Sequence, residues 1–357
     1  MNISSQEADK DSSEIKSVCS RLVGSEVTYI QRIGGGRNSK VYKLTCENDS
    51  QYAAKLYFRH KSDQRNRLVT EFSSLQFLWE NGVSQIPQPL VADKDFGCAL
   101  YEYIEGSNIL PEEVTSNEIS QAVNFLIKLA ELKTRENSHL LPLASEAFFS
   151  VQAIIQNIEQ RLSRLSTIPN SETPYKALAK FLTGEFQPAF HQIVNWCQTK
   201  LNQSQMSYRA EIEDREKTLS PSDFGFHNAL RRANGEIIFV DFEYFGWDDP
   251  AKTISDFILH PAMELGDSLR QQFLGSMLRG FSDYGHLAKR VEIVYPLFGL
   301  KWCLILLNEF VPQDLLRRGF AQGSELDRSP LQIEQLAKAK LMLQKILANY
   351  EQFPYGR

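Results

Sequence analysis

The stretch LSPSDFGFHNAL, at residues 219–230, contains the pattern that decides the fold of this 357-residue chain. An aspartate, Asp223, is followed five residues later by an asparagine, Asn228. After a short polar turn, the apolar run EIIFV ends in a second aspartate, Asp241. One carboxylate can orient a hydroxyl group, while an asparagine and another carboxylate supply the hard oxygen ligands that Mg²⁺ prefers. The pattern favours a catalytic loop followed by a metal-binding strand end over the alternative of a surface hairpin with incidental acids.

A second motif is rich in glycine: IGGGRNSKVY, at residues 33–42, lies between two predicted strands. Consecutive glycines let the backbone turn tightly, and the N–H groups of such a turn can surround phosphate oxygens. The motif is not a Walker loop, because no Gly-Lys-Ser/Thr sequence leads from it into a helix. A plain glycine-rich hairpin turn is the alternative interpretation. The candidate cofactor-binding residues of this motif are Gly34, Gly35, Gly36, Asn38 and Ser39.

A lysine and a glutamate follow the glycine-rich motif. Lys55 lies on a mainly apolar predicted strand, one hairpin further along, where it would suit pairing with nucleotide phosphates. Glu71 is the only acid between Asp63 and Glu80, on the next predicted helix. A buried lysine needs a carboxylate partner, so we expect Glu71 to pair with Lys55. The alternatives are a solvent-facing strand lysine and a solvent-facing helix glutamate.

Together these motifs resemble those of the aminoglycoside phosphotransferase and choline kinase group of small-molecule kinases. The resemblance runs from about residue 28 to residue 312, and DDPA at residues 248–251 is similar to the Gly-Asp-Pro-Ala segment of that group. It implies an α+β, protein-kinase-like fold with two lobes. The N-lobe would be small and built on an antiparallel sheet, and the C-lobe would be large and mostly helical.

The resemblance also implies cofactors and roles. ATP would lie between the lobes, with its adenine at the backbone of the segment Glu102, Tyr103 and Ile104. Lys55, held by Glu71, would pair with the α and β phosphates. Asn228 and Asp241 would bind Mg²⁺. Asp223 would be the catalytic residue that orients the acceptor hydroxyl.

The catalytic loop contains a triplet that can be misread and a proline in an unusual position. The triplet Asp223-Phe224-Gly225 spells the metal-binding triplet of protein kinases, but residues 199–210 contain no aspartate that could be the catalytic one. We therefore interpret Asp223 as the catalytic-loop aspartate. Pro221 stands two residues before Asp223, where the related kinases usually have a histidine that braces the loop. Its loss would weaken activity, unless the proline stiffens the loop instead.

The hydrophobic pattern divides the chain into three parts. Residues 1–14 are predicted to be a flexible tail with a short helix starting near its end, 15–105 the nucleotide-binding N-lobe, and 106–357 the C-lobe, with a helical insertion at about 140–215. Alternation and turn residues predict five N-lobe strands. Helical periodicity predicts helices at 64–81, 116–133 (with Ser116 as N-cap), 146–168 and 175–203.

Composition limits the partners and the location. With 39 Lys and Arg against 44 Asp and Glu, the chain is mildly acidic, which argues against binding to nucleic acid mainly through phosphates. Its most apolar stretch, residues 293–307, is interrupted by Pro296 and Lys301, so we expect no membrane association. The N-terminus does not resemble a signal peptide, and five scattered cysteines fit a cytoplasmic protein. The sequence carries no indication of oligomeric state.

The expected function is phosphorylation of a hydroxyl group on a small molecule: a sugar, an amino-alcohol or an aminoglycoside-like acceptor. Pro250 follows only nine residues after Asp241, which is too short a span for an activation segment that holds a peptide. An ATP-binding scaffold without transfer activity is the main alternative, and a protein kinase is the third. His227 and His260 are interpreted as packing or hydrogen-bonding residues. Four aromatic residues could line an acceptor pocket or belong to the core: Tyr244, Phe245, Trp247 and Trp302.

Overall fold

The computed structural model describes residues 4–35, 38–58, 65–169, 173–311 and 328–353. They form two compact units. Unit 1 contains the described residues up to Asn108 together with Asn228–Phe245, and unit 2 contains Ile109–His227 and the described residues from Gly246 onward. Unit 1 is built on an antiparallel sheet and unit 2 is mostly helical, which is the predicted α+β, kinase-like division. Asn228–Phe245, which we had expected in the C-lobe, groups with unit 1.

Five antiparallel strands form the sheet of unit 1, in the order β1-β2-β3-β5-β4. Their bounds are β1 Val27–Gly34, β2 Ser39–Cys46, β3 Gln51–Tyr57, β4 Pro89–Asp93 and β5 Cys98–Glu102. β3 lies in the middle of the sheet, where Lys55 is paired with Val41 on one side and Ala99 on the other. The following helix, α2 (Arg67–Glu80), begins at the N-cap Asn66. These elements agree closely with the sequence-based prediction.

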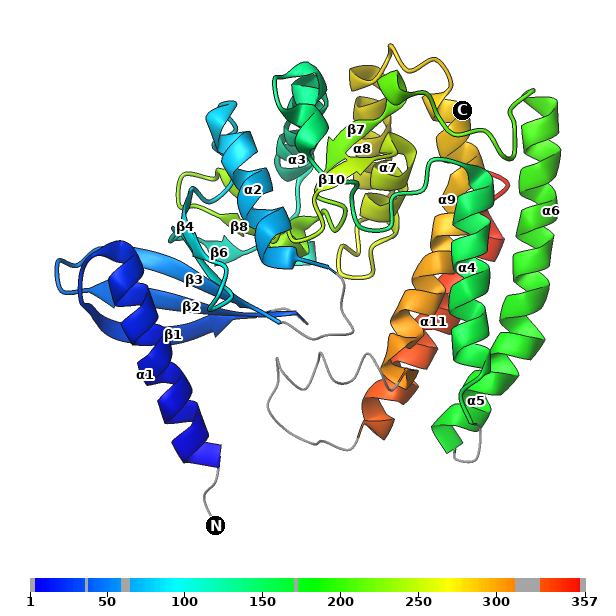
Figure 1. Ribbon diagram of the computed structural model, residues 1–357. Coiled ribbons are helices and arrows are strands. Elements are labelled where there is room, and N and C mark those ends of the chain that lie inside the picture. The colour runs from blue at the N-terminus through cyan, green and yellow to red at the C-terminus, as the bar shows by residue number, and fades with distance from the viewer. Residues whose placement is uncertain (1–3, 36–37, 59–64, 170–172, 312–327, 354–357) are drawn as a thin grey trace. The chain divides into compact units, whose positions relative to one another are not determined.

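The first helix, α1, spans Ser4–Val23 and is therefore longer than expected. It includes most of the segment predicted as a flexible tail, so that part of the prediction was wrong. Ile15 and Cys19 are completely buried, and they pack with Val27 and Leu44 of the sheet. Figure 1 shows α1 in dark blue beside β1. This burial anchors the C-terminal half of α1 to the sheet.

A second, smaller sheet in unit 1 contains β6 (Ser107–Asn108), β8 (Ala229–Arg231) and β9 (Ile237–Phe239). β8 and β9 form the predicted hairpin, in register from Ala229 opposite Phe239. Just beyond this register, the N–H of Val240 donates to the carbonyl of Asn228 at 2.9 Å. The hairpin therefore holds the two predicted magnesium ligands, Asn228 and Asp241, at its open end.

Unit 2 begins with α3 (Ser116–Glu131), whose N-cap is Thr115 and not Ser116 as predicted. The Thr115 hydroxyl accepts the N–H of Asn117, and the Glu118 carboxylate accepts the N–H of Thr115 at 2.8 Å. This reciprocal capping box fixes the start of the helix. The segment predicted as one helix at 175–203 is divided by a π-helical turn. Its parts are α5 Thr173–Phe181, the turn Leu182–Phe186 and α6 Gln187–Gln203.

The core of unit 2 is α9 (Leu287–Leu306), which contacts α4 (Val151–Ser166), α6, α7 (Pro250–Leu259) and α11 (Ser329–Asn349). Figure 1 shows α4, α6, α9 and α11 running alongside one another. The segment Leu287–Phe310 is long and apolar enough to cross a membrane, but 78% of its most apolar window is buried inside the protein. That burial is typical of the core helix of a soluble protein.

Short elements of unit 2 support the loop that carries Asp223. β7 (Thr218–Ser220) pairs antiparallel with β10 (Gly246–Asp248). Helix α7 follows β10, and its N-cap Asp249 accepts the N–H of Ala251 at 2.8 Å. The guanidinium of Arg290, from α9, donates to the same carboxylate at 2.6 Å. The start of α7 is therefore anchored to the core helix directly beneath β7.

Candidate active site

Lys55 has its ammonium group between two carboxylates of unit 1. Its Nζ lies 2.6 Å from Glu71 Oε2 and 2.7 Å from Asp241 Oδ1. The Lys55 side chain is 8% exposed and that of Glu71 is 4% exposed, so both charges are almost withdrawn from water. Burial without such partners would favour the neutral amine. The structure thus brings the predicted pair together and adds Asp241 as a second partner.

The charges of this cluster and its burial shift the pKa values of Lys55 and Glu71. Burial alone would lower the pKa of Lys55, but the carboxylates of Asp241 and Glu71 outweigh it and raise that pKa well above the usual value. Burial raises the pKa of Glu71, and attraction by Lys55 opposes the shift. The hydroxyl of Tyr57 donates to Glu71 Oε2 at 2.9 Å, and the N–H of Phe242 donates to Oε1 at 3.2 Å. Both Glu71 oxygens are therefore bonded.

Asp241 is more accessible than its two partners, since its side chain is 30% exposed. Its φ of 68° lies in the left-handed region, which costs a non-glycine residue about 1–2 kcal/mol. A carboxylate and the amide oxygen of Asn228 form a hard donor set of the kind that Mg²⁺ accepts. Glu71, Asp241 and Glu243 also have carboxylate oxygens within 4.8 Å of one another. Because Lys55 already bridges two of these acids, we interpret that trio as an ion-pair cluster.

Asn38 belongs to the segment after the predicted glycine-rich loop, and its side chain is buried. Its Nδ2 donates to Glu243 Oε1 and to the hydroxyl of Tyr244, both at 2.6 Å. Burial is the main cause that raises the pKa of Glu243 to about 7, and the charge of Asp241 adds to it. Asn38 therefore ties the start of β2 to the segment that follows Asp241, while its predicted contact with a cofactor stays a prediction.

The other predicted cofactor-binding residues that the structure describes lie in unit 1. Gly35 has a φ of 150°, and a Cβ there would lie 2.6 Å from the carbonyl oxygen of Ser39, so the turn requires glycine. Ser39 is buried at the start of β2, Gly34 ends β1, and Gly36 lies outside the described residues. The Glu102 carboxylate accepts from the Arg232 guanidinium at 3.0 Å. Ile104 is buried, and Lys43 lies over the Tyr103 ring at 4.3 Å.

In unit 2, two histidines approach the same oxygen of Asp223. His227 Nε2 lies 3.2 Å from Oδ1, and His260 Nε2 lies 3.5 Å from it. The two imidazole rings are stacked, with their centres 3.8 Å apart and their planes 2° from parallel. Burial would raise the pKa of Asp223, but the hydrogen bond from His227 and the charges of His260 and Lys252 lower it to about 2. Asp223 is therefore held as a carboxylate, with its side chain still 38% exposed.

The position of the ring proton of His260 indicates whether the cluster of Asp223, His227 and His260 is a metal site. Ligand atoms of Asp223, His227 and His260 lie within 4.8 Å of one another, close enough for a metal site. However, His260 Nδ1 accepts the N–H of Ala262 at 3.2 Å, so the proton of the neutral ring is on Nε2, facing Asp223. A metal would need the lone pair of that nitrogen. We therefore interpret the cluster as hydrogen-bonded, in line with the interpretation of both histidines from the sequence.

Gly225 makes the fold of this loop possible. A Cβ at this position would lie 2.7 Å from His227 Nδ1 and 2.7 Å from the sulfur of Met263. Only a residue without a side chain lets the ring of His227 fold back towards Asp223, four residues earlier in the chain. The glycine that completes the misleading Asp-Phe-Gly triplet thus has a packing role here.

The four aromatic candidates for an acceptor pocket are divided between the two units. Phe245 is completely buried and Tyr244 bonds to Asn38, so both are structural residues of unit 1. In unit 2, the indole N–H of Trp247 donates to the carbonyl of Ser138 at 3.0 Å. The indole N–H of Trp302 donates to Asp256 at 2.8 Å, and its ring packs edge-on against His260. Of the four, Trp302 is the one in contact with the Asp223 cluster.

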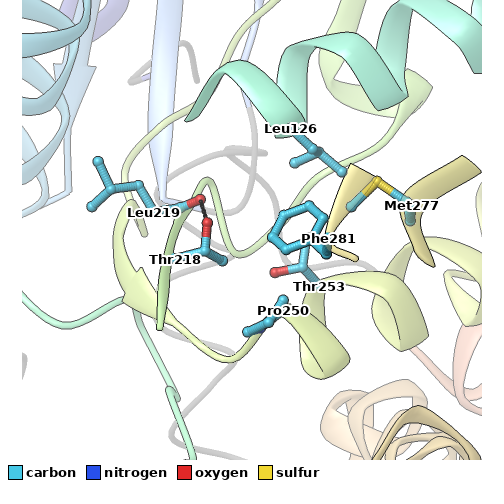
Figure 2. Close-up of a pocket in the computed structure, with 7 residues that line it drawn as sticks. All are labelled: Leu126, Thr218, Leu219, Pro250, Thr253, Met277 and Phe281. Atoms are coloured by element: carbon cyan, nitrogen blue, oxygen red, sulfur yellow. Dashed lines mark hydrogen bonds between the residues drawn. The ribbon is translucent and has the colours of Figure 1, made fainter. Parts of the chain in front are cut away.

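A small apolar gap in unit 2 lies behind β7, and it has no room for a water molecule. Figure 2 shows the seven side chains that line it: Leu126, Thr218, Leu219, Pro250, Thr253, Met277 and Phe281. Met277 comes from α8 (Asp267–Gly280), and Phe281 follows that helix. The gap is a packing defect of the core and not an acceptor site.

The sequence analysis missed two residues at the catalytic loop, Lys252 and Ser222. Lys252, on α7, is 1% exposed and lies 2.6 Å from Asp248 Oδ2. Its Nζ also donates to the hydroxyl of Ser222 at 3.1 Å. A signal existed, because a lysine in the apolar run PAKTISDFIL requires a buried partner.

Comparison with known proteins supports the fold and the family. The sequence model of the phosphotransferase enzyme family (APH) matches residues 30–289. A spectinomycin phosphotransferase, APH(9)-Ia, in complex with ADP and spectinomycin, is 15% identical, with a TM-score of 0.65 over 96% of this chain and 98% of that one. A choline kinase from Cryptosporidium parvum Iowa II is 12% identical, with a TM-score of 0.60 over 94% and 96% of the two chains. The gentamicin complex of APH(2")-IIa is 18% identical, with a TM-score of 0.59 over 97% of each chain.

The comparison with curated proteins found no match. The family match nevertheless covers more than half of the chain and includes Lys55, Glu71, Asp223, Asn228 and Asp241. The structural likeness extends over nearly the whole length of both chains in each pair. This chain belongs to the phosphotransferase enzyme family.

Proposed function

We propose that this protein is a kinase that uses Mg²⁺ and ATP to phosphorylate a hydroxyl group of a small molecule. The observation that carries the proposal is the position of Lys55, buried between Glu71 and Asp241. Phosphoryl transfer requires a fixed cation for the phosphates and a carboxylate for the metal. The ADP-bound spectinomycin phosphotransferase, which shares the fold, supports a nucleotide as the cofactor.

In this proposal, the residues of unit 1 bind the nucleotide. Lys55 pairs with the α and β phosphates, and Glu71 keeps its ammonium group in place. Asn228 and Asp241 would hold Mg²⁺, which would neutralise charge on the phosphates. The segment around Glu102, Tyr103 and Ile104 meets the adenine, and the glycine-rich segment covers the phosphates.

Asp223 orients the acceptor hydroxyl. A carboxylate with a pKa of about 2 is a poor general base near neutral pH, because efficient proton transfer needs a pKa close to the working pH. The Asp223 side chain is 38% exposed, so a substrate O–H group can reach its carboxylate and donate to it. The gain in rate then comes from positioning and charge stabilisation more than from early proton removal.

The acceptor is a hydroxyl-bearing small molecule, and we favour a sugar or an amino-alcohol over an antibiotic. The exposed acids near β7 offer little support for binding a polycationic drug, because Glu213 and Asp214 are already paired with Arg215 and Lys217. The proposal includes a cytoplasmic location and no nucleic-acid or membrane partner.

Acceptor-dependent release of ADP tests this proposal. The purified protein is incubated with Mg²⁺, ATP and a panel of amino-alcohols, sugars and aminoglycosides, and ADP is measured by a coupled assay. We expect one acceptor class to stimulate ADP release, and chelation of Mg²⁺ to abolish it. Binding of ATP without transfer to any acceptor would favour the ATP-binding scaffold instead, and absence of ATP binding would contradict both.

A further inference from the structure

The residue before Asp223 has an unusual backbone conformation. Ser222 has a φ of 68°, in the left-handed region that few residues other than glycine adopt. Such a conformation persists only where the surrounding structure holds it. The loop histidine expected from the resemblance is absent, since Pro221 stands in its place. Other groups must therefore fix the orientation of the Asp223 carboxylate.

Three hydrogen bonds hold Ser222 in place. Its N–H donates to the hydroxyl of Ser220 at 3.0 Å. Its own hydroxyl donates to the carbonyl of Ser145 at 2.9 Å and accepts from Lys252 Nζ at 3.1 Å. The Ser222 hydroxyl is thus clamped between a backbone carbonyl and a buried ammonium group.

Lys252 is itself fixed within α7. It forms ion pairs with Asp248 at 2.6 Å and with Asp256 at 3.4 Å, and it is almost completely buried. The next residue, Thr253, donates its hydroxyl to that of Ser220 at 3.0 Å. Two adjacent residues of one rigid helix therefore hold the two serines that flank Pro221.

We propose that Lys252 is a positioning residue for the reaction, which acts through Ser222 to hold the catalytic loop where the related kinases use a histidine. Together with Thr253 it fixes Ser220 and Ser222, and so the direction in which Asp223 points. This role rests on the proposed function, because it gives Lys252 a part in phosphoryl transfer without contact with the substrate.

The first test removes the clamped hydroxyl with Ser222→Ala and leaves the ion pairs of Lys252 intact. We expect faster amide hydrogen exchange in residues 218–228 and a fall in kcat of about 10-fold or more, with the KM for ATP unchanged. Ser255→Ala is the matched control, because Ser255 is also buried on α7 but donates to the carbonyl of Ala251. The control should change neither measurement.

The second test removes the cation. Lys252→Met alone would leave Asp248 buried without its partner and could unfold the protein, so the double variant Lys252→Met/Asp248→Asn removes both charges. It should reproduce the faster exchange and the lower kcat of Ser222→Ala. Wild-type exchange in residues 218–228 in both variants, or wild-type kcat in both, would overturn the proposal. If the wild-type protein transfers phosphate to no acceptor, the proposed function fails, while the exchange measurement still decides whether Lys252 holds the loop.

Discussion

The two charged clusters of this protein shift the pKa values of their acids in opposite directions. Around Lys55, three carboxylates crowd together in unit 1, and burial raises the pKa of Glu71 and of Glu243. In unit 2, Asp223 has histidines and a lysine as neighbours and a pKa of about 2. In the first cluster, Lys55 and Arg67, which lies 3.7 Å from Glu243, face three carboxylates, whereas the second cluster keeps one carboxylate ionised and partly exposed to water.

The difference follows from the neighbours more than from depth alone. In a buried acid beside other acids, desolvation and repulsion both destabilise the charged form, so the pKa rises. An acid that accepts hydrogen bonds and faces cationic groups is stabilised in its charged form. In the proposed function, the Lys55 cluster would hold Mg²⁺ and the phosphates, and the positive charge of the metal would offset the repulsion among the carboxylates. The Asp223 cluster would orient a neutral hydroxyl group.

The largest effect is expected from Lys55→Met. This change leaves Glu71 and Asp241 facing each other without a cation, and the loss of one partner from such a cluster costs about 3–5 kcal/mol. Urea unfolding at pH 7 measures it. Lys43→Met on the neighbouring strand β2 is the control, since Lys43 contacts the Tyr103 ring and should contribute only about 0.5–1 kcal/mol. Equal losses in the two variants would show that Lys55 does not balance the cluster.

Glu243 should make stability depend on pH. Because its pKa rises from 4.5 to about 7 on folding, the folded protein keeps a proton that the unfolded chain loses over this range. This contribution is complete below pH 4.5 and is lost as the pH rises through 7. At about 1.4 kcal/mol per pKa unit, the loss is at most about 3.5 kcal/mol. As the pH rises from 5 to 8, the unfolding free energy of the wild type should fall relative to that of Glu243→Gln.

The control for this experiment is Asp214→Asn. The hydrogen bond from Lys217 lowers the pKa of Asp214, so this carboxylate is ionised over the whole range and its difference from wild type should stay constant between pH 5 and 8. Parallel curves for wild type and Glu243→Gln would contradict the raised pKa of Glu243.

A smaller effect is expected from Gly225→Ala. The added methyl group would push against the ring of His227 and the sulfur of Met263, and such overpacking costs about 1–3 kcal/mol. Thermal unfolding measures the loss, and a lower kcat would accompany it as His227 moves from Asp223. Gly184→Ala is the control, because a Cβ there meets nothing within 4 Å. An unchanged melting temperature for Gly225→Ala would show that the loop can adapt.

Much of the fold could be predicted because it depends on local patterns. The strands around Lys55 and the helix that carries Glu71 follow from alternation, turn residues and helical periodicity. The extension of α1 to Ser4 could not be predicted in this way, since residues 4–13 carry no apolar stripe.

The site shows the same limit. The order of Lys55, Glu71 and Asp241 was informative because charged residues in apolar elements must find partners. The pairing of Asp223 with His260 joins residues 37 positions apart, and no sequence pattern indicates that contact. Lys252 offered a signal, but its partner Ser222 could be identified only from the turn that the loop adopts.

The most direct test of the account compares the wild-type protein with Asp223→Ala. With Mg²⁺, ATP and the acceptor identified from the panel, transfer of the γ-phosphoryl group is measured alongside ATP binding by calorimetry. The account predicts that Asp223→Ala binds ATP as tightly as the wild-type protein, because Lys55, Glu71 and Asp241 are unchanged, while transfer is abolished. Full transfer activity in Asp223→Ala would contradict it.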